Sequence, residues 1–178
     1  MGRVAQRRAR ANELQETFGG ELLDEDAYPA WDALFEEGLQ AVWAAHDDAA
    51  RVVDELRAAG VAVGALSNAP VAYQLRKLEH AGLDSVPLLV GLDTLGFGKP
   101  DPRVFLEACR LLGTDPARTA YIGDELDIDA QAAVSAGLVG IWLDRPGSRR
   151  LEISDDDVAA AGVLVVPDLD QLPAALGL

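Results

Sequence analysis

The spacing of apolar residues divides this chain into two parts that meet near residue 47. Residues 4–18 and 26–45 place apolar side chains at helical intervals, as expected for amphipathic helices. The pair Gly19-Gly20 interrupts the pattern between them. We therefore expect the first part to form a helical hairpin without strands.

After residue 47, short runs of Val, Leu and Ile alternate with segments of helical period. The runs predict strands at 61–66, 86–90, 119–122, 139–143 and 163–166, and the segments predict helices between Asp48 and Gly60 and at 71–81, 102–112, 128–136, 154–160 and 169–176. Strands that are apolar at consecutive positions are buried on both faces. The sheet is therefore predicted to be parallel and flanked by helices, which makes the second part an α/β unit.

Composition narrows the function classes. The 178 residues are 49% hydrophobic, and the net charge of −15 argues against nucleic-acid binding, which needs surplus Lys and Arg. No apolar run approaches the ~18 residues of a membrane span. The sequence shows no secretory signal, and its single cysteine, Cys109, cannot form an internal disulfide. We expect a cytoplasmic protein that binds neither nucleic acid nor membrane.

Polar residues follow three of the predicted strands, where ligands bind in open parallel sheets. Ser67 and Asn68 follow the first strand, and a hydroxyl beside free N–H groups suits an anionic oxygen. Lys99 lies in a loop of glycines and prolines after the second strand, where it can act as a fixed positive charge. Each signal is weak alone, because Ser and Asn also cap helices and lone lysines are common on surfaces.

The stretch YIGDELDID at 121–129 gathers acidic residues after the third predicted strand. Converging carboxylates repel one another unless a cation compensates them, and oxygen ligands without His or Cys suit Mg²⁺ better than Zn²⁺. In the alternative interpretation, Asp127 caps the next helix and Glu125 faces water. We adopt that interpretation for Glu125 and leave Asp127 open. Asp124 and Asp129 are the predicted metal ligands.

Together these strings resemble the haloacid dehalogenase superfamily of hydrolases, from about residue 47 to the end of the chain. Leu66-Ser67-Asn68 is similar to the second motif of that family, and Lys99 within GFGKPDPRVF is similar to the third. Gly123-Asp124 through Asp129 is similar to the fourth motif, GD-x-x-x-x-D. The leading hairpin resembles the α-helical cap of the family.

The resemblance implies a mechanism in which an aspartate attacks phosphorus and water hydrolyses the aspartyl-phosphate, with Mg²⁺ bridging nucleophile and phosphate. Ser67 would then hydrogen-bond a phosphoryl oxygen, with the backbone of Asn68 assisting. Lys99 would offset negative charge between nucleophile and phosphate. Asp124 would bind Mg²⁺, and Asp129 would support the metal directly or through water. The implied substrate is a small phosphorylated metabolite.

The family carries its nucleophile in D-x-D-G-[TS] at the end of a strand, and no segment here fits that pattern. Asp24-Glu25-Asp26 has the D-x-D spacing but lacks a preceding apolar strand, while Asp93 and Asp144 follow apolar runs without a second matching aspartate. We therefore expect a Rossmann-like, three-layer α/β core with a parallel sheet at 47–178 and a partial α-helical cap at 1–46. The first, central strand is expected to be missing, as in an N-terminally truncated hydrolase.

Other functions stay open. The same fold without its nucleophile could be a non-catalytic binding or regulatory module, with the exposed sheet edges allowing self-association. A response-regulator receiver also uses clustered Asp with Ser or Thr and Lys, but a helical hairpin ahead of all strands does not suit it. A dehalogenase of the same superfamily is possible, although the GD-x-x-x-x-D pattern favours phosphate.

Overall fold

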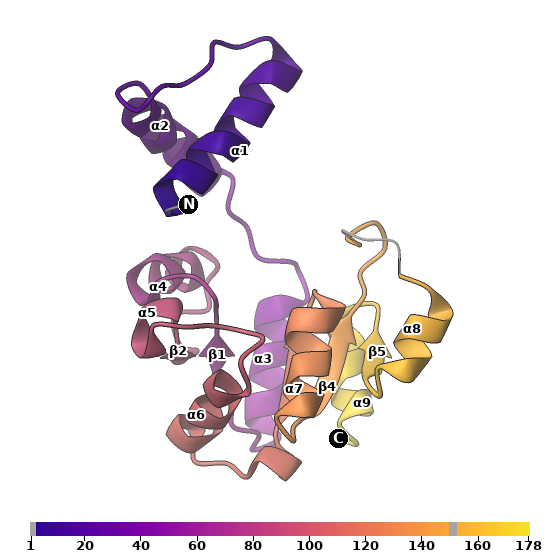
Figure 1. Ribbon diagram of the computed structural model, residues 1–178. Helices are drawn as coiled ribbons and strands as arrows, with labels where there is room; N and C mark the ends of the chain where they lie inside the picture. Colours follow the sequence, from indigo (N-terminus) through magenta and orange to yellow (C-terminus); the bar gives the residue numbers. More distant parts are fainter. Residues whose placement is uncertain (1–2, 150–152) are drawn as a thin grey trace. The chain divides into compact units, whose positions relative to one another are not determined.

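The computed structural model describes residues 3–149 and 153–178, which form two compact units (Figure 1). The first unit is Met1–Trp43 and the second is Ala44–Leu178. The assignment of the first unit as a cap stays a prediction.

The first unit is a helical hairpin in which α1 (Arg3–Phe18) packs on α2 (Tyr28–Ala41). Pro29 lies in the first turn of α2, where its missing N–H costs no hydrogen bond. The Arg7 guanidinium on α1 lies 2.7 Å from a Glu36 oxygen on α2. The buried Tyr28 donates a hydrogen bond to Asp32 at 2.8 Å. The Arg7–Glu36 pair joins the two helices, whereas the Tyr28–Asp32 hydrogen bond lies within α2.

The second unit follows the predicted alternation of strands and helices. Its strands are β1 (Ala65–Leu66), β2 (Leu88–Val90), β3 (Ala120–Gly123), β4 (Val139–Leu143) and β5 (Leu164–Val166). Its helices are α3 (Ala49–Ala58), α4 (Val71–His80), α5 (Leu92–Leu95), α6 (Pro102–Leu112), α7 (Ala132–Ser135), α8 (Asp155–Ala160) and α9 (Leu172–Ala175), with the shorter turns η1 (Pro116–Arg118), η2 (Leu126–Gln131) and η3 (Leu169–Gln171).

The strands form two parallel sheets. The first has the order β1-β2 and the second has the order β3-β4-β5. Within the described residues, β1 pairs with β2 alone and β3 pairs with β4 alone, so each has one edge without a strand partner. The predicted parallel α/β class is confirmed. Whether a further strand belongs between β1 and β3 stays a prediction.

The predicted burial of every strand on both faces is wrong for β1, β3 and β5, and in β5 both Leu164 and Val165 are exposed. In β4, Gly140, Ile141 and Trp142 are buried, whereas all residues of β1 and β3 are only partly buried. The free edges of β1 and β3 have no neighbouring strand among the described residues to cover them. The first predicted strand is also shorter than expected, since only Ala65–Leu66 of 61–66 is paired.

Helices cover both faces of the sheets, which gives the predicted three layers. On one face, Val104 and Phe105 of α6 and Ala133 of α7 pack with Val90 of β2, and Cys109 is buried in the same cluster. On the other face, α3 and α9 pack on β4 and β5 through an apolar cluster of Val52, Leu56, Ile141, Val166 and Leu172. The core therefore holds the carboxyl ends of the strands in fixed positions.

A buried carboxylate ties three loops at those ends. Asp48 accepts hydrogen bonds from the Arg145 guanidinium at 2.7 and 2.8 Å and from the Leu169 N–H at 2.9 Å. Burial favours a higher pKa for Asp48. The Leu169 and Arg145 hydrogen bonds outweigh it, so the pKa lies below its ordinary value of 3.8.

This shift predicts a pH dependence of stability. Because the folded pKa of Asp48 is depressed, its contribution is complete above the unfolded pKa near 3.8 and is lost as pH falls through the folded pKa. We expect the free energy of unfolding of the unsubstituted chain to exceed that of Asp48→Asn at neutral pH, and this difference to shrink below about pH 4. Urea unfolding of both proteins across this range tests it, and a constant difference would contradict the assignment.

Candidate active site

Ser67 and Asn68 follow β1 and form the start of the turn that leads to α4. The Ser67 hydroxyl accepts a hydrogen bond from the Ala69 N–H at 3.1 Å and lies 3.3 Å from the Gln74 side-chain oxygen. Ser67 is partly buried, and Asn68 is exposed. The Ser67 hydroxyl is therefore held at the strand end, where a rotation could turn it toward an anionic oxygen.

The Asn68 side chain binds the main chain of Lys99. Its amide nitrogen donates to the Lys99 carbonyl at 3.0 Å, and its oxygen accepts from the Lys99 N–H at 2.7 Å. Gly98 is needed for this approach, since a Cβ there would lie 2.2 Å from the Asn68 oxygen. The side chain thus fixes the loop that carries Lys99, a role that sequence analysis did not assign to it.

Lys99 reaches from this loop to the end of β3. Its ammonium donates to an Asp129 carboxylate oxygen at 2.5 Å and to the Tyr121 hydroxyl at 2.8 Å. The Lys99 side chain is 11% exposed, and that of Asp129 is 4% exposed. Burial favours a lower pKa for Lys99, but Tyr121 and Asp129 outweigh it and raise the pKa. The ammonium therefore stays charged in the site.

Asp129 owes its position to the irregular helix η2. This segment is a π-helix, a form that widens the turn and often occurs at functional sites. The second Asp129 oxygen accepts from the Glu125 N–H at 3.1 Å. A Cβ at Gly123 would lie 2.3 Å from that oxygen, so only glycine leaves room for the carboxylate there. The glycine of the GD pair therefore serves the close approach of Asp129 to the strand.

The other acidic residues of this stretch differ in exposure. Asp124 follows β3 and is exposed, and its carbonyl accepts a hydrogen bond from the Trp142 indole at 3.1 Å. Asp127 is exposed and lies inside η2, so the interpretation of Asp127 as a helix cap is wrong. The cap position belongs to Glu125, which is partly buried rather than facing water as expected.

Asp124 and Asp129 are chemically suited to Mg²⁺, which is bound in proteins by one or two carboxylates together with water and substrate phosphate. Both carboxylates lie close enough to Tyr121 for their charges to act on its phenol. Among the residues that the structure describes, no group of three or more His, Cys, Asp or Glu could hold a metal ion. The described part of the chain thus offers carboxylates for a hydrated hard cation rather than a complete protein cage.

The structure brings Lys99 and Asp129 into direct contact and joins Asn68 to the Lys99 loop. Ser67 follows β1 and Asp124 follows β3, in two different sheets. Tyr121 is a contact of Lys99 that sequence analysis missed. It stands in the apolar run that leads to Gly123-Asp124, where a tyrosine is read as core. Its hydroxyl was the only feature of the sequence that could have indicated a polar contact at this position.

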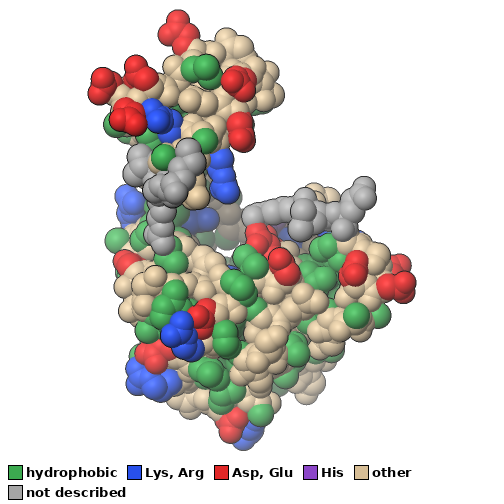
Figure 2. All heavy atoms as spheres, viewed as in Figure 1, with side chains coloured by type: hydrophobic (Ala, Val, Ile, Leu, Met, Phe, Trp, Pro, Cys, Tyr) green, Lys and Arg blue, Asp and Glu red, His purple; other side chains and the backbone are tan. Residues whose placement is uncertain are grey.

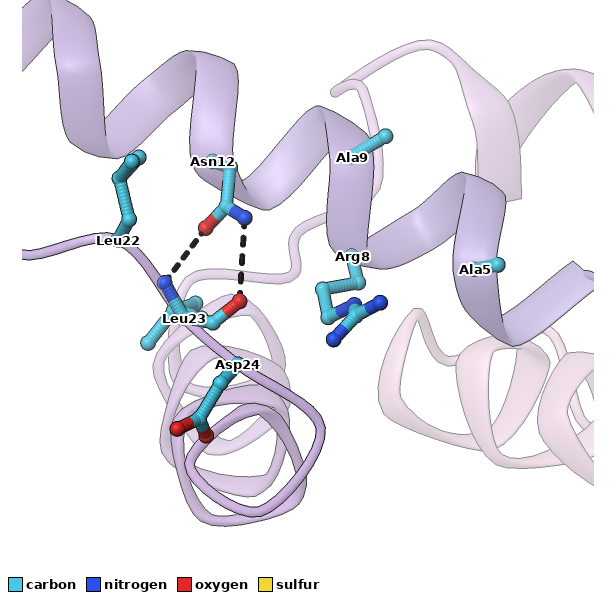
Figure 3. A pocket seen from close by; sticks show the side chains of 7 residues that line it. All are labelled: Ala5, Arg8, Ala9, Asn12, Leu22, Leu23 and Asp24. Atoms are coloured by element: carbon cyan, nitrogen blue, oxygen red, sulfur yellow. Dashed lines mark hydrogen bonds between the residues drawn. The ribbon is translucent and has the colours of Figure 1, made fainter.

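A separate hollow of about 410 Å³ lies in the first unit (Figure 3). At its edge, the Asn12 side-chain oxygen accepts a hydrogen bond from the Leu23 N–H at 2.8 Å, and the Asn12 amide nitrogen donates to the Leu23 carbonyl at 3.1 Å. Its lining combines one arginine and one acid with small and apolar residues, namely Ala5, Arg8, Ala9, Asn12, Leu22, Leu23 and Asp24. None of the predicted site residues lines this hollow.

Figure 2 shows hydrophobic side chains scattered over the visible face of the second unit, with acidic and basic groups between them. The most exposed large apolar side chains belong to the first unit, where Phe18 is 82% exposed and Val42 is 75% exposed. Among the described residues, no helix combines the length and the apolar character that crossing a membrane requires.

Residues 2–137 match the sequence profile of the haloacid dehalogenase-like hydrolases. The profile spans most of the chain and includes the Ser67, Lys99 and Asp124 segments. The chain belongs to the haloacid dehalogenase-like hydrolase family.

Two similar proteins are phosphatases by name. The chain is 34% identical to a glyceraldehyde 3-phosphate phosphatase of Methanopyrus kandleri over 104 residues, which is 58% of this chain and 45% of that protein. It is 36% identical to a phosphoserine phosphatase of Thermus thermophilus over 103 residues, which is 56% of this chain and 41% of that protein. The chain thus matches less than half the length of either relative.

A solved structure supports the fold assignment. The putative HAD-hydrolase YfnB from Bacillus subtilis, solved with magnesium bound, has a TM-score of 0.79 at 20% identity. The comparison covers 100% of this chain and 74% of that one. At this identity the likeness concerns the fold alone.

Proposed function

We propose that the chain forms part of a Mg²⁺-dependent phosphate monoester hydrolase that acts on a small phosphorylated metabolite. The observation that carries the proposal is the partly buried Lys99 ammonium, which lies 2.5 Å from Asp129 and 2.8 Å from the Tyr121 hydroxyl of β3. A preorganised charge in a site of low dielectric is suited to stabilising the negative charge of a phosphoryl group in the transition state. The phosphatase names of two relatives support the same class of reaction.

Each site residue receives a role in positioning or charge. The Ser67 hydroxyl and the Asn68 N–H would bind a phosphoryl oxygen after β1, and the Asn68 side chain would hold the Lys99 loop. Lys99 would offset negative charge on the phosphoryl group. Asp124 and Asp129 would hold Mg²⁺, which when bound supplies further compensation of phosphate charge.

The nucleophile is proposed to come from a strand that this sequence does not contain. The free edges of β1 and β3 and their partial burial support a site for one further parallel strand between the two sheets. A carboxylate at the end of that strand would lie between the residues after β1 and those after β3. The exposed apolar surface of the hairpin agrees with its being part of a larger helical cap.

Hydrolysis of an aryl phosphate with Mg²⁺ tests this function. The 178-residue chain is compared with a longer chain that adds the segment encoded ahead of residue 1. We expect activity only in the longer chain, and that segment should contain an apolar run ending in D-x-D-G-T. A longer chain that contains this motif, folds, and still fails to hydrolyse any phosphate ester would contradict the proposal.

Asp124→Asn tests the metal assignment in the longer chain that is expected to hydrolyse phosphate esters, called the hydrolysing chain from here on. Loss of the carboxylate charge should weaken Mg²⁺ binding, so we expect the Mg²⁺ concentration for half-maximal rate to rise by at least about tenfold. The rate at low Mg²⁺ should fall with it. Asp127→Asn is the matched control, because Asp127 is an exposed acid of the same stretch. Equal Mg²⁺ dependence in the two variants would refute the role of Asp124.

The free strand edges favour one second candidate, a non-catalytic module that binds a phosphorylated ligand or a strand of a partner chain. This candidate predicts that the 178-residue chain binds inorganic phosphate with Mg²⁺ but that no catalytic segment is encoded ahead of it. Calorimetric titration with phosphate, together with the upstream coding sequence, separates the two candidates.

A further inference from the structure

The Lys99 side chain is held at both ends, and its tip depends on a residue outside the recognised motifs. At its base, the Asn68 amide pairs with the Lys99 N–H and carbonyl. At its tip, the ammonium donates to Asp129 and to the Tyr121 hydroxyl. We propose that Tyr121 is a positioning residue that aims the Lys99 ammonium at the phosphoryl site. This inference rests on the proposed function.

The Tyr121 ring is itself rigidly placed. It lies on β3 and packs edge-on against the ring of the fully buried Phe105, with the ring centroids 5.0 Å apart and the planes at 87°. Its hydroxyl also lies 3.3 Å from the carbonyl of Leu66, the residue before Ser67 on β1. The packing of its ring on β3 therefore fixes the Tyr121 oxygen at 2.8 Å from the Lys99 ammonium.

Such support matters because a lysine side chain has a long, flexible stem and a point charge. Asp129 alone would fix one N–H of the ammonium but not its rotation about that bond. A second acceptor, the Tyr121 oxygen, defines the orientation of the group. An ammonium has three N–H groups, and among the described residues two acceptors contact it, so one N–H remains for an anionic oxygen.

The Tyr121 oxygen is a neutral acceptor, so it leaves the positive charge of the Lys99 ammonium uncompensated by a further negative group. Burial raises the pKa of Tyr121, so the phenol keeps its proton and takes no positive charge away from Lys99. A second carboxylate at this place would make the local charge negative and would repel phosphate. The phenol orients the ammonium without that cost.

Nuclear magnetic resonance of the lysine side chains tests the inference without needing catalysis. The sequence contains only two lysines, Lys99 and the exposed Lys77, so a chain with ¹⁵N-labelled lysine should give two ammonium signals. We expect the Lys99 ammonium to exchange its protons slowly with water in the unsubstituted chain. Tyr121→Phe keeps the ring and removes the hydroxyl, and it should shift the Lys99 signal and speed its exchange while Lys77 stays unchanged.

Tyr28→Phe is the matched control, since it also removes a tyrosine hydroxyl with a hydrogen bond but lies in the first unit. It should leave the Lys99 signal unchanged, and backbone amide spectra report whether each variant is folded. A Lys99 signal that is unaltered by Tyr121→Phe would overturn the inference. The inference would also be overturned if the Lys99 ammonium of the unsubstituted chain exchanged its protons as fast as that of Lys77. This outcome does not depend on whether Tyr121→Phe folds.

In the hydrolysing chain, a double-mutant cycle separates positioning from structure. Tyr121→Phe should lower kcat by about tenfold, as expected for losing one hydrogen bond to a charged group. In a Lys99→Ala background the same change should have an effect below about twofold, because the group that it positions is gone. An equal loss in both backgrounds would overturn the inference. Failure of all chains to hydrolyse phosphate esters would instead count against the proposed function, and the resonance experiment would still decide the role of Tyr121.

Discussion

Alanine in place of Lys99 is expected to lower kcat of the hydrolysing chain by about 100- to 1,000-fold, or roughly 3 kcal/mol of transition-state stabilisation. The reason is that Lys99 is a partly buried, preorganised charge whose ammonium is fixed by Asp129 and Tyr121. Steady-state hydrolysis of an aryl phosphate measures the effect. Lys77→Ala, which removes the other lysine of the chain, is the control and should keep the full rate.

The same substitution should also lower stability, because Asp129 would remain buried without its cation. We expect Lys99→Ala to reduce the free energy of unfolding by about 3 kcal/mol, the size typical of breaking one half of a buried ion pair. Adding Asp129→Leu removes the unpaired charge and should recover much of that loss. Urea unfolding of the single and double variants tests this, and a double variant less stable than Lys99→Ala would contradict it. The rate loss and the stability loss can thus be separated.

Gly140→Ala is expected to destabilise the second unit by about 3 kcal/mol, at the upper end of the usual cost of overpacking. A Cβ at Gly140 of β4 would lie 2.1 Å from the Ala130 carbonyl oxygen and 2.8 Å from a Val134 methyl group. The nearer atom belongs to the backbone of η2, so no side-chain rotation can relieve the clash. Thermal unfolding followed by circular dichroism measures the loss.

The control is Gly38→Ala, where, apart from the chain neighbours and the helix's own backbone, no atom of the described residues lies within 4 Å of the added Cβ. In the last turn of α2, alanine should be neutral or stabilise by up to about 1 kcal/mol, because it restricts the unfolded chain. Equal stability of Gly140→Ala and the unsubstituted protein would show that η2 can move away from β4. That result would also weaken the argument that η2 holds Asp129 in place.

The positions of residues at the strand ends could be predicted from local sequence patterns, whereas strand length could not. Ser67, Lys99 and Asp124 could be placed after their strands from sequence, because strand and turn signals are properties of a few neighbouring residues. The expected absence of a central strand between β1 and β3 stays a prediction. The length of the first strand was overestimated, since pairing at 61–64 depends on what lies beside β1 and not on its own apolar residues.

Exposure and helix type were harder to predict. Asp127 was a candidate cap because η2 was expected to start at Ile128, but the wider π turn begins at Leu126. The widened turn accompanies close packing of η2 on β4, where Gly140 meets the Ala130 carbonyl. That contact joins residues of two different elements, η2 and β4, so the period of neither element could have indicated it.

The order of helices and strands, the parallel α/β class and the residues at the strand ends followed from the sequence alone, because apolar period, caps and turns act locally. The hydrogen bonds that hold Lys99 were decided only by the tertiary structure. Asn68, Tyr121 and Asp129 come from three separate segments, and their distances depend on how η2, β3 and the Lys99 loop pack together. Side-chain packing between distant segments has no periodic signature in a single sequence, which is why the contact of Tyr121 with Lys99 was not predicted.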